Sequence, residues 1–229
     1  MTAHFKDTGP PQSIKITELE SAGYALKPCI YRAFGKRTLD VFIVIAGAPV
    51  GVMLIAFAAL LAVLGGQSPF YVQPRVGKDG KIFRMLKIRT MVADADTVLE
   101  DYLAQHPSAR KEWDEKQKLK DDPRISRFGA FLRKTSLDEM PQLWNVLKGD
   151  MSIVGPRPMM VNQQSLYPGK AYYMLRPGIT GPWQVSDRHH SSFSSRAIFD
   201  AEYNQGLSLK NDLRILARTV EVVLRCTGC

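Results

Sequence analysis

The stretch RKTSLDEMPQLWNVLKGDMSIVGPRP, from Arg133 to Pro158, carries an adjacent acid pair, Asp138 and Glu139, shortly before Pro141. Ser136-x-x-Glu139 matches a capping box, in which Ser136 caps a helix and Glu139 reaches back to its backbone N–H. Asp138 would then lie in the first turn, where the helix dipole favours a negative charge. This interpretation needs no chemistry, but it leaves Pro141 at a position where a helical hydrogen bond is lost.

Basic residues surround the acid pair along the chain and favour a second interpretation. Two carboxylates among cations suit a phosphorylated substrate with Mg²⁺, which prefers carboxylate and phosphate oxygens. A carboxylate near cations at a helix start is expected to have a lowered pKa and to stay ionised. An ionised carboxylate can attack phosphorus and form an acyl-phosphate. The basic residues considered are Lys87, Arg89, Arg124, Arg127, Arg133, Lys134, Lys148 and Arg157.

Two Gly/Pro turns carry further candidate binding residues. GPRP, residues 155–158, holds Arg157 between prolines, so its guanidinium is partly oriented in advance. RPGITGPWQV, residues 176–185, places Arg176 before Pro-Gly and Trp183 after Gly-Pro. An arginine and an aromatic ring in such a loop can grip a nucleotide base and its phosphates. A purely structural turn remains an alternative for each.

An uncharged stretch from Val41 to Leu64 is long enough to cross a hydrocarbon core of about 30 Å at about 1.5 Å per residue. Positive residues tend to stay cytoplasmic, and here both flanks are positive. A helix that enters and turns back keeps both flanks on one side, and Pro49 supplies the bend. A kinked but spanning helix is the alternative. The flanking basic residues are Arg32, Lys36, Arg37, Arg75, Lys78, Lys81 and Arg84.

The rest of the chain predicts a helix-rich α+β fold. A small β-hairpin follows the membrane helix, with Phe70 to Val72 in a strand and Asp79-Gly80 in its turn. Residues 94–120 predict a charged helical pair broken at Pro107. Apolar residues between Leu213 and Leu224 recur at helical spacing among arginines, which fits either a membrane-surface helix or a core helix.

The domain plan has three parts. We expect residues 1–35 to form an N-terminal extension, residues 36–66 the re-entrant membrane helix, and residues 67–229 a cytoplasmic-face catalytic domain with amphipathic interfacial helices. The net charge of +9 over 229 residues favours an anionic partner such as nucleic acid, phospholipid headgroups or a phosphorylated substrate. Three cysteines argue against a disulfide framework, and the lone pair Cys226 and Cys229 lacks the ligands of a zinc site.

Residues 36–225 resemble the bacterial sugar transferases, the monotopic polyprenyl-phosphate phosphoglycosyl transferases. The resemblance lies in KRTLD before the apolar stretch, in RMLKIRTM, in DDPRISRFGAFLRKTSLDEMPQLWNVLKGDMSIVGPRP and in RPGITGPWQVSDR. It implies that a UDP-sugar donates its sugar 1-phosphate to undecaprenyl phosphate, giving undecaprenyl-diphosphate-sugar and UMP. It also implies a re-entrant helix in the bacterial inner membrane, with the catalytic domain on the cytoplasmic face.

The same resemblance assigns roles to particular residues. Asp138 is the implied nucleophile, and Glu139 would help to hold Mg²⁺ and to position a phosphate. Lys87, Arg133 and Arg157 match positions of phosphate and nucleotide contacts, and Arg89, Arg176 and Trp183 are added as candidates. Asp187 departs from the family, which usually has glycine in QVSGR. Residues 94–120 are most similar to members that start exopolysaccharide synthesis, which favours UDP-galactose or UDP-glucose as donor.

Two rival hypotheses stand beside this one. A membrane-tethered protein that binds nucleic acid or anionic lipid would show strongly salt-dependent binding and no turnover. The basic residues lie among acids and rigid turns rather than in one stripe, so no nucleic acid is expected. In the second rival Asp138 is only a metal ligand, and the lipid phosphate attacks the donor directly. Whether the chain forms a homodimer stays open.

Overall fold

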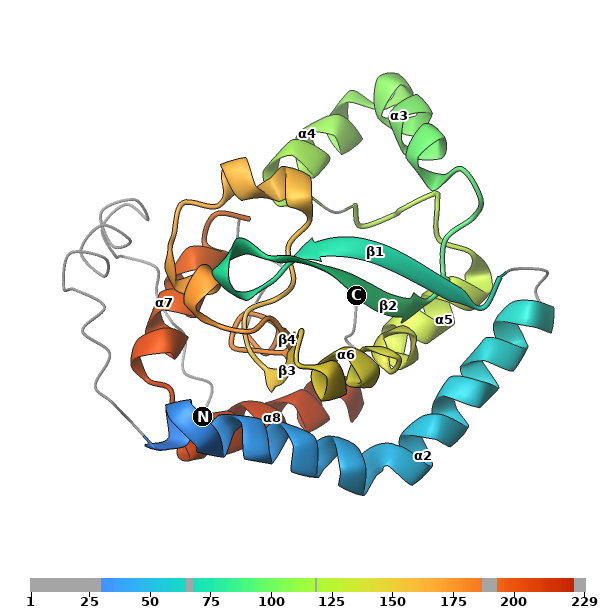
Figure 1. The fold of residues 1–229 in the computed structure, drawn as a ribbon. Helices are drawn as coiled ribbons and strands as arrows, with labels where there is room; N and C mark the ends of the chain where they lie inside the picture. The colour runs from blue at the N-terminus through green and yellow to red at the C-terminus, as the bar shows by residue number, and fades with distance from the viewer. Residues whose placement is uncertain (1–29, 65–67, 118, 187–192, 225–229) are drawn as a thin grey trace, which may run out of the picture.

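The fold is seen in a computed structural model that describes residues 30–64, 68–117, 119–186 and 193–224 (Figure 1). Most of the expected N-terminal extension, Asp187, and the pair Cys226 and Cys229 lie outside the described residues. The described chain is helix-rich with two small two-stranded sheets, so the α+β class is confirmed. The parallel sheet was not predicted.

The apolar stretch forms one long helix, α2 (Lys36–Leu64), which continues from a π-helical turn, η1 (Tyr31–Gly35). Pro49 lies inside α2, and Figure 1 shows the helix bent along its length. Both halves pack on the same body: Val44 belongs to the main core, whereas Ala58 and Ala62 are buried further along. The opposite face exposes large apolar side chains: Phe42, Ile45, Val50, Val52, Met53, Phe57, Leu60 and Val63.

The predicted hairpin is confirmed as β1 (Phe70–Val76) and β2 (Ile82–Ile88), which pair antiparallel. A short turn, η2 (Lys78–Gly80), connects them. Asp79 and Gly80 have φ angles of 57° and 75°, the left-handed conformation that an Asp-Gly turn accommodates.

The charged segment is also a helical pair as predicted, α3 (Ala95–Gln105) and α4 (Pro107–Lys116), with Pro107 at the start of the second helix. Leu99, Leu103 and Leu119 form a small core of their own beneath it. The pair lies at the side of the body that is opposite α2 (Figure 1).

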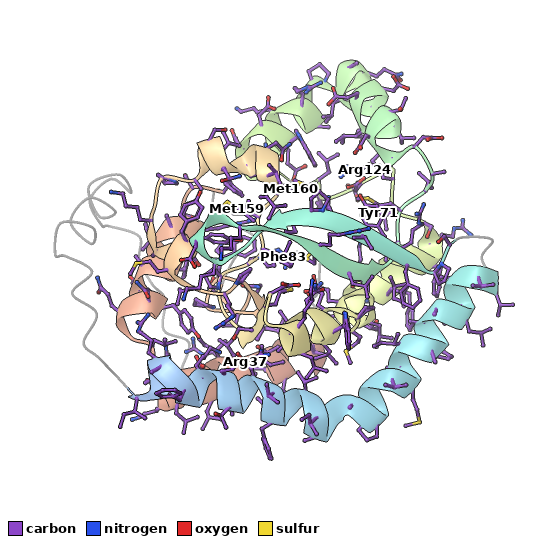
Figure 2. The ribbon with its side chains drawn as sticks, viewed as in Figure 1. Arg37, Tyr71, Phe83, Arg124, Met159 and Met160 are labelled. Carbon is purple, nitrogen blue, oxygen red and sulfur yellow. The ribbon has the colours of Figure 1, made fainter. Side chains whose placement is uncertain are left out.

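Three short elements run through the acid-pair region: α5 (Arg127–Lys134), η3 (Leu137–Glu139) and α6 (Gln142–Lys148). Arg37, labelled on α2 in Figure 2, donates hydrogen bonds to the carbonyl oxygens of Val146 and Leu147 at the end of α6. A cation at a helix C-terminus interacts favourably with the helix dipole, so this contact fixes α6 on α2.

The second sheet pairs β3 (Ser152–Val154) with β4 (Gly178–Thr180) in parallel. A Cβ on Gly178 would lie 2.1 Å from the backbone N of Gly155, so these two backbones approach more closely than a side chain allows. This approach brings the Arg157 loop beside the loop that carries Trp183.

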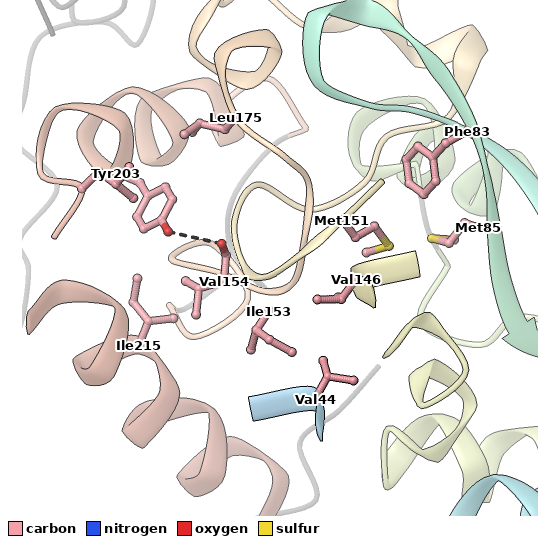
Figure 3. Close-up of a cluster of buried hydrophobic side chains, with 11 residues drawn as sticks. Val44, Phe83, Met85, Val146, Met151, Ile153, Val154, Leu175, Tyr203 and Ile215 are labelled. Atoms are coloured by element: carbon pink, nitrogen blue, oxygen red, sulfur yellow. Dashed lines mark hydrogen bonds between the residues drawn. The ribbon is translucent and has the colours of Figure 1, made fainter. Parts of the chain in front are cut away.

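The remaining elements complete the core. They are η4 (Val161–Leu166), η5 (Ala171–Met174), α7 (Arg196–Gln205) and α8 (Leu209–Leu224). Figure 3 shows the main buried cluster, in which the Tyr203 hydroxyl oxygen lies 3.2 Å from the Val154 carbonyl oxygen. The cluster contains Val44, Phe83, Met85, Val146, Met151, Ile153, Val154, Leu175, Tyr203, Leu207 and Ile215.

A buried polar network ties the start of α2 to this core. Asp40 accepts hydrogen bonds from the Ser152 hydroxyl at 3.0 Å and the Ile153 backbone N–H at 2.9 Å. Asp212 accepts from the Tyr31 hydroxyl at 2.5 Å and the Tyr203 hydroxyl at 2.7 Å. The Lys36 ammonium lies 3.4 Å from Asp40 and 3.0 Å from Asp212. Lys36 is thus the charge partner of both buried carboxylates, and buried charges are costly unless they are paired.

Several helices outside α2 also present apolar side chains to the surface. In α8, Ile215 is buried in the core, whereas Leu213, Val220 and Val223 are exposed. The helix therefore packs on the core with one side and presents apolar side chains to the surface with another. Phe131 of α5 and Trp144 and Leu147 of α6 are exposed too. Such residues suit a membrane surface.

Candidate active site

The acid pair does not form a capping box. Ser136 has a φ of 57°, a left-handed conformation uncommon for serine, and its side chain caps nothing. Glu139 turns to Lys87 instead of back to Ser136. The helix α6 begins only after Pro141, so this proline removes no hydrogen bond from it. The capping prediction was therefore wrong, because α5 ends and the chain reverses direction before the acid pair.

Lys87 is the cation that joins the two acids. Its ammonium lies 2.9 Å from Oε1 of Glu139 and 3.8 Å from Oδ2 of Asp138. Lys87 comes from β2 and the acids from η3, so the pairing depends on the packing of the hairpin against this turn. Asp138 is buried, and both other side chains are largely buried.

Burial raises the pKa of Asp138 above its ordinary value, although Lys87, Arg133 and Arg157 oppose that rise and Glu139 adds to it. The sequence predicted the opposite direction because it could not show how deeply the carboxyl lies in the protein. A carboxylate taken out of water loses hydration that nearby cations only partly replace.

Arg133 and Arg157 complete the charged site. The Arg133 Nε donates a 2.9 Å hydrogen bond to the Thr90 hydroxyl, which leaves the rest of its guanidinium to other partners. Burial lowers the pKa of Arg133, while Asp138 and Asp122 oppose the change. Arg157 places Nη2 at 3.8 Å from Oε1 of Glu139. The structure therefore gathers Lys87, Arg133 and Arg157 around the acid pair.

The other three candidate residues make their printed contacts with groups outside the acid pair. The guanidinium of Arg89 lies 5.7 Å from the ring centroid of Tyr71, which Figure 2 labels on β1. Arg176 is exposed and donates a 2.9 Å hydrogen bond from Nε to the Gly149 carbonyl oxygen. Trp183 is buried, with its indole against the guanidinium of Arg196 rather than open for a base to stack on it.

Two partly buried arginines that sequence reasoning did not single out lie within electrostatic reach of Arg157. Arg75 of β1 and Arg196 of α7 each have a lowered pKa, caused first by burial and next by repulsion from Arg157. In the sequence, Arg75 stands out only as a basic residue that flanks the apolar stretch. No sequence motif links Arg196 to the acid pair, because only the packing of α7 in the folded chain brings Arg196 toward Arg157.

The donor set can be tested against Mg²⁺. Among the described residues, no group of three or more His, Cys, Asp or Glu side chains could hold a metal. Asp138 and Glu139 alone supply adjacent carboxylates. Mg²⁺ is usually bound through one or two carboxylates together with substrate phosphates and water, so the residues fit an ion that arrives with a phosphorylated substrate.

The helix composed of Tyr31–Leu64 is long and apolar enough to cross a membrane, and the search covered only the described residues. Only 17% of its most apolar window is buried inside the protein, so most of that surface has no cover from the rest of the chain. This exposure, together with the apolar faces of α5, α6 and α8, suggests membrane association.

Comparison with known proteins shows the family of this chain. Residues 31–226 match the family described as bacterial sugar transferase. The UDP-galactose-lipid carrier transferase of Erwinia amylovora is 48% identical over 199 residues, which are 85% of this chain and 41% of that protein. The undecaprenyl-phosphate galactose phosphotransferase of Salmonella typhimurium is 44% identical over 197 residues, again 85% and 41% of the two chains.

A shorter relative matches over most of its length. The exopolysaccharide production protein ExoY of Rhizobium meliloti is 42% identical over 200 residues, which are 84% of this chain and 87% of that protein. The chain spans about two fifths of the length of the Erwinia and Salmonella relatives. The family match and these identities lead to one conclusion: the chain belongs to the bacterial sugar transferase family.

Proposed function

We propose that this protein transfers a sugar 1-phosphate from a UDP-sugar to undecaprenyl phosphate, which yields undecaprenyl-diphosphate-sugar and UMP. The observation that carries the proposal is the buried Asp138 among Lys87, Arg133 and Arg157, beside a helix with a long exposed apolar face. A nucleophile among cations suits phosphoryl transfer, since positioning and charge stabilisation dominate that chemistry. Priming of exopolysaccharide synthesis is the corresponding role, as the name of the Rhizobium relative suggests.

The mechanism has two steps. A carboxylate oxygen of Asp138 attacks the β-phosphorus of the UDP-sugar, a new O–P bond forms, and the bond to the UMP oxygen breaks with its electron pair leaving on UMP. A phosphate oxygen of the lipid then attacks the same phosphorus and displaces the Asp138 carboxylate. The net result is transfer of the sugar phosphate, and Asp138 returns to its starting form.

The cations favour the attacking form of Asp138 and stabilise charge on the phosphate. Lys87, Arg133 and Arg157 each lower the pKa of Asp138 against the effect of burial. Lys87 also holds Glu139 at 2.9 Å, which keeps the two acids in fixed relation. Asp138 and Glu139 would hold Mg²⁺ with the diphosphate, and the ion would supply positive charge to the phosphate oxygens.

The proposed topology is a re-entrant α2 with the catalytic domain on the cytoplasmic face of the bacterial inner membrane. Support comes from contacts at both ends of the helix: Asp40 is hydrogen-bonded to β3, and Ala62 is buried in a cluster with Ile88 and Leu132. A helix that crosses the bilayer would carry one end away from the catalytic body. The bend at Pro49 lets both ends remain with it.

The proposed donor is UDP-galactose or UDP-glucose. Two relatives carry galactose in their names, which favours UDP-galactose of the two. A panel of UDP-sugars with detection of released UMP identifies the donor directly.

The proposal is tested with the full chain in lipid nanodiscs. Asp138→Asn should abolish UMP release, because the amide is a poor nucleophile, whereas Asp79→Asn in the hairpin turn should leave release unchanged. Mass spectrometry should detect a sugar-phosphate adduct on Asp138 when the donor is added without lipid. Near-normal UMP release by Asp138→Asn would contradict the nucleophile assignment, and turnover without an adduct would favour direct attack by the lipid phosphate.

A further inference from the structure

Arg196 is a cation that packs against two aromatic rings and carries a buried, unpaired N–H group. Its guanidinium carbon lies 4.2 Å from the ring centroid of Trp183 and 4.6 Å from that of Phe193. Its Nε is buried without a hydrogen-bond partner. Because an arginine carries five donors and a buried unpaired donor is costly, this side chain is built for an acceptor outside the described chain.

Two more arginines from other elements converge on the same place. Arg75 donates a 3.3 Å hydrogen bond from Nη1 to the Pro158 carbonyl oxygen, yet its Nε is also buried without a partner. Burial, followed by repulsion from Arg157, lowers the pKa of Arg75 to about 10 and that of Arg196 to about 9. Arg75 also lowers the pKa of Arg196, so all three guanidinium groups lie within electrostatic reach of one another.

The local carboxylates do not balance this charge. Asp200 accepts a 2.7 Å hydrogen bond from the Tyr167 hydroxyl, and burial raises its pKa to about 7. At neutral pH Asp200 is thus only partly ionised beside Arg196. Glu139 lies 3.8 Å from Arg157 but is shared with Lys87 at 2.9 Å. A net positive charge remains, which favours a ligand with more than one negative charge.

We propose that Arg196, with Arg75 and Arg157, forms a second phosphate subsite next to Asp138, and that this subsite holds the phosphate that leaves with the nucleotide. The assignment rests on the proposed function, because it takes the donor to carry two linked phosphates. Arg157 lies between the two groups of cations: its charge acts on Asp138 and also on Arg75 and Arg196. Lys87 and Arg133 then serve the transferred phosphate.

The chemistry of the subsite agrees with this division. The planar guanidinium donates two parallel hydrogen bonds to phosphate oxygens, and the rings of Trp183 and Phe193 hold it in place before the ligand arrives. Positive charge at this phosphate lowers the energy of UMP as it departs. Trp183 therefore acts as a positioning residue for Arg196, not as a platform for the base.

Equilibrium binding of UMP and of pyrophosphate to the full chain in nanodiscs tests the proposal by calorimetry. Arg196→Gln should weaken both ligands by about 10- to 100-fold, the loss expected for charged hydrogen bonds. Arg196→Lys keeps the charge but loses the paired donors of the guanidinium, so its affinity for both ligands should lie between those of Arg196→Gln and the wild type. Arg110→Gln is the matched control, since Arg110 is exposed on α4 and paired with Glu100, and it should bind as the wild type does.

A folded Arg196→Gln variant that binds both ligands within twofold of the wild type would overturn the subsite and leave Arg196 a structural partner of Asp200. Near-UV circular dichroism establishes folding, and Arg196→Lys carries the test if the glutamine variant does not fold. The lipid also brings a phosphate. A raised KM for undecaprenyl phosphate with unchanged UMP affinity would refute the nucleotide assignment.

The outcome for the subsite is separable from that for the proposed function. If the wild type binds pyrophosphate in an Arg196-dependent way but neither binds UMP nor releases it from any UDP-sugar, the UDP-sugar donor is wrong and the phosphate subsite stands. If UMP is released normally while Arg196→Gln leaves UMP and pyrophosphate affinity intact, the function stands and the subsite is wrong.

Discussion

Asp40→Asn is expected to destabilise the protein strongly, although Asp40 lies far in sequence from the acid pair. Oδ1 of Asp40 accepts two hydrogen bonds from β3, at 3.0 and 2.9 Å, and lies 3.4 Å from the Lys36 ammonium. The carboxyl is about 1% exposed, so water cannot replace these contacts. Asparagine keeps the shape and removes the charge.

The magnitude follows from these contacts. A hydrogen bond to a charged group contributes about 1.5–3 kcal/mol and a neutral one about 0.5–1.5 kcal/mol, so two weakened bonds cost roughly 2–3 kcal/mol. Lys36 loses one of its two carboxylate partners but keeps Asp212 at 3.0 Å, which limits the further loss. The expected decrease in the free energy of unfolding is therefore about 2–4 kcal/mol.

Urea unfolding of the detergent-solubilised chain, followed by tryptophan fluorescence, measures this change. Asp79→Asn is the matched control, because Asp79 is exposed in the hairpin turn and asparagine tolerates its left-handed backbone. Ser152→Ala combined with Asp40→Asn should cost less than the sum of the two single changes, since the two side chains share a hydrogen bond. A loss below about 0.5 kcal/mol, the usual range of surface substitutions, would refute the anchoring role of Asp40.

Three further predictions concern the site and its surroundings. Glu139→Gln should raise the Mg²⁺ concentration for half-maximal UMP release, and an unchanged requirement counts against a role in metal binding. Because the folded pKa of Asp200 is raised to about 7, its neutral form stabilises the fold at low pH, and that contribution falls as pH rises from about 4 to 7. The unfolded carboxyl is already mostly ionised at pH 5, so urea unfolding at pH 5 and 8 should show a loss of about 2.5–3 kcal/mol that Asp200→Asn removes. Identical pH dependence in both proteins would refute this role of Asp200. Ser136→Gly should raise the free energy of unfolding by about 0.5–1 kcal/mol, since glycine adopts the φ of 57° without strain, and equal or lower stability argues against strain there.

Local patterns in the sequence were enough for the elements that depend on local chemistry. The uncharged run predicted α2, and the Asp-Gly turn predicted the hairpin, because hydropathy and turn geometry act over a few residues. The same reasoning failed at Ser136. A capping box needs an extended cap residue, whereas the end of α5 forces a left-handed one, and that constraint comes from packing.

The environment of the site was less predictable than its residues. Lys87, Arg133 and Arg157 were expected near Asp138 from the family resemblance, and the structure brings them there. The direction of the Asp138 pKa shift was wrong, because burial depends on how the hairpin and α5 close over the carboxyl. Arg196 could not be found from spacing, since it is 58 positions beyond Asp138 and only α7 packing connects them.

The hydrogen bonds between Asp40 and β3 also bear on how the proposed re-entrant helix would respond to membrane thickness. A lone crossing helix adjusts to a thicker or thinner membrane by tilting. Here the first half of α2 is fixed to β3, and the second half is packed on Leu132, so tilting would break contacts at one end. With α2 re-entrant as proposed, a change in lipid chain length has to move the whole catalytic body relative to the headgroups, and the distance from Asp138 to the lipid phosphate becomes a property of the membrane as much as of the enzyme.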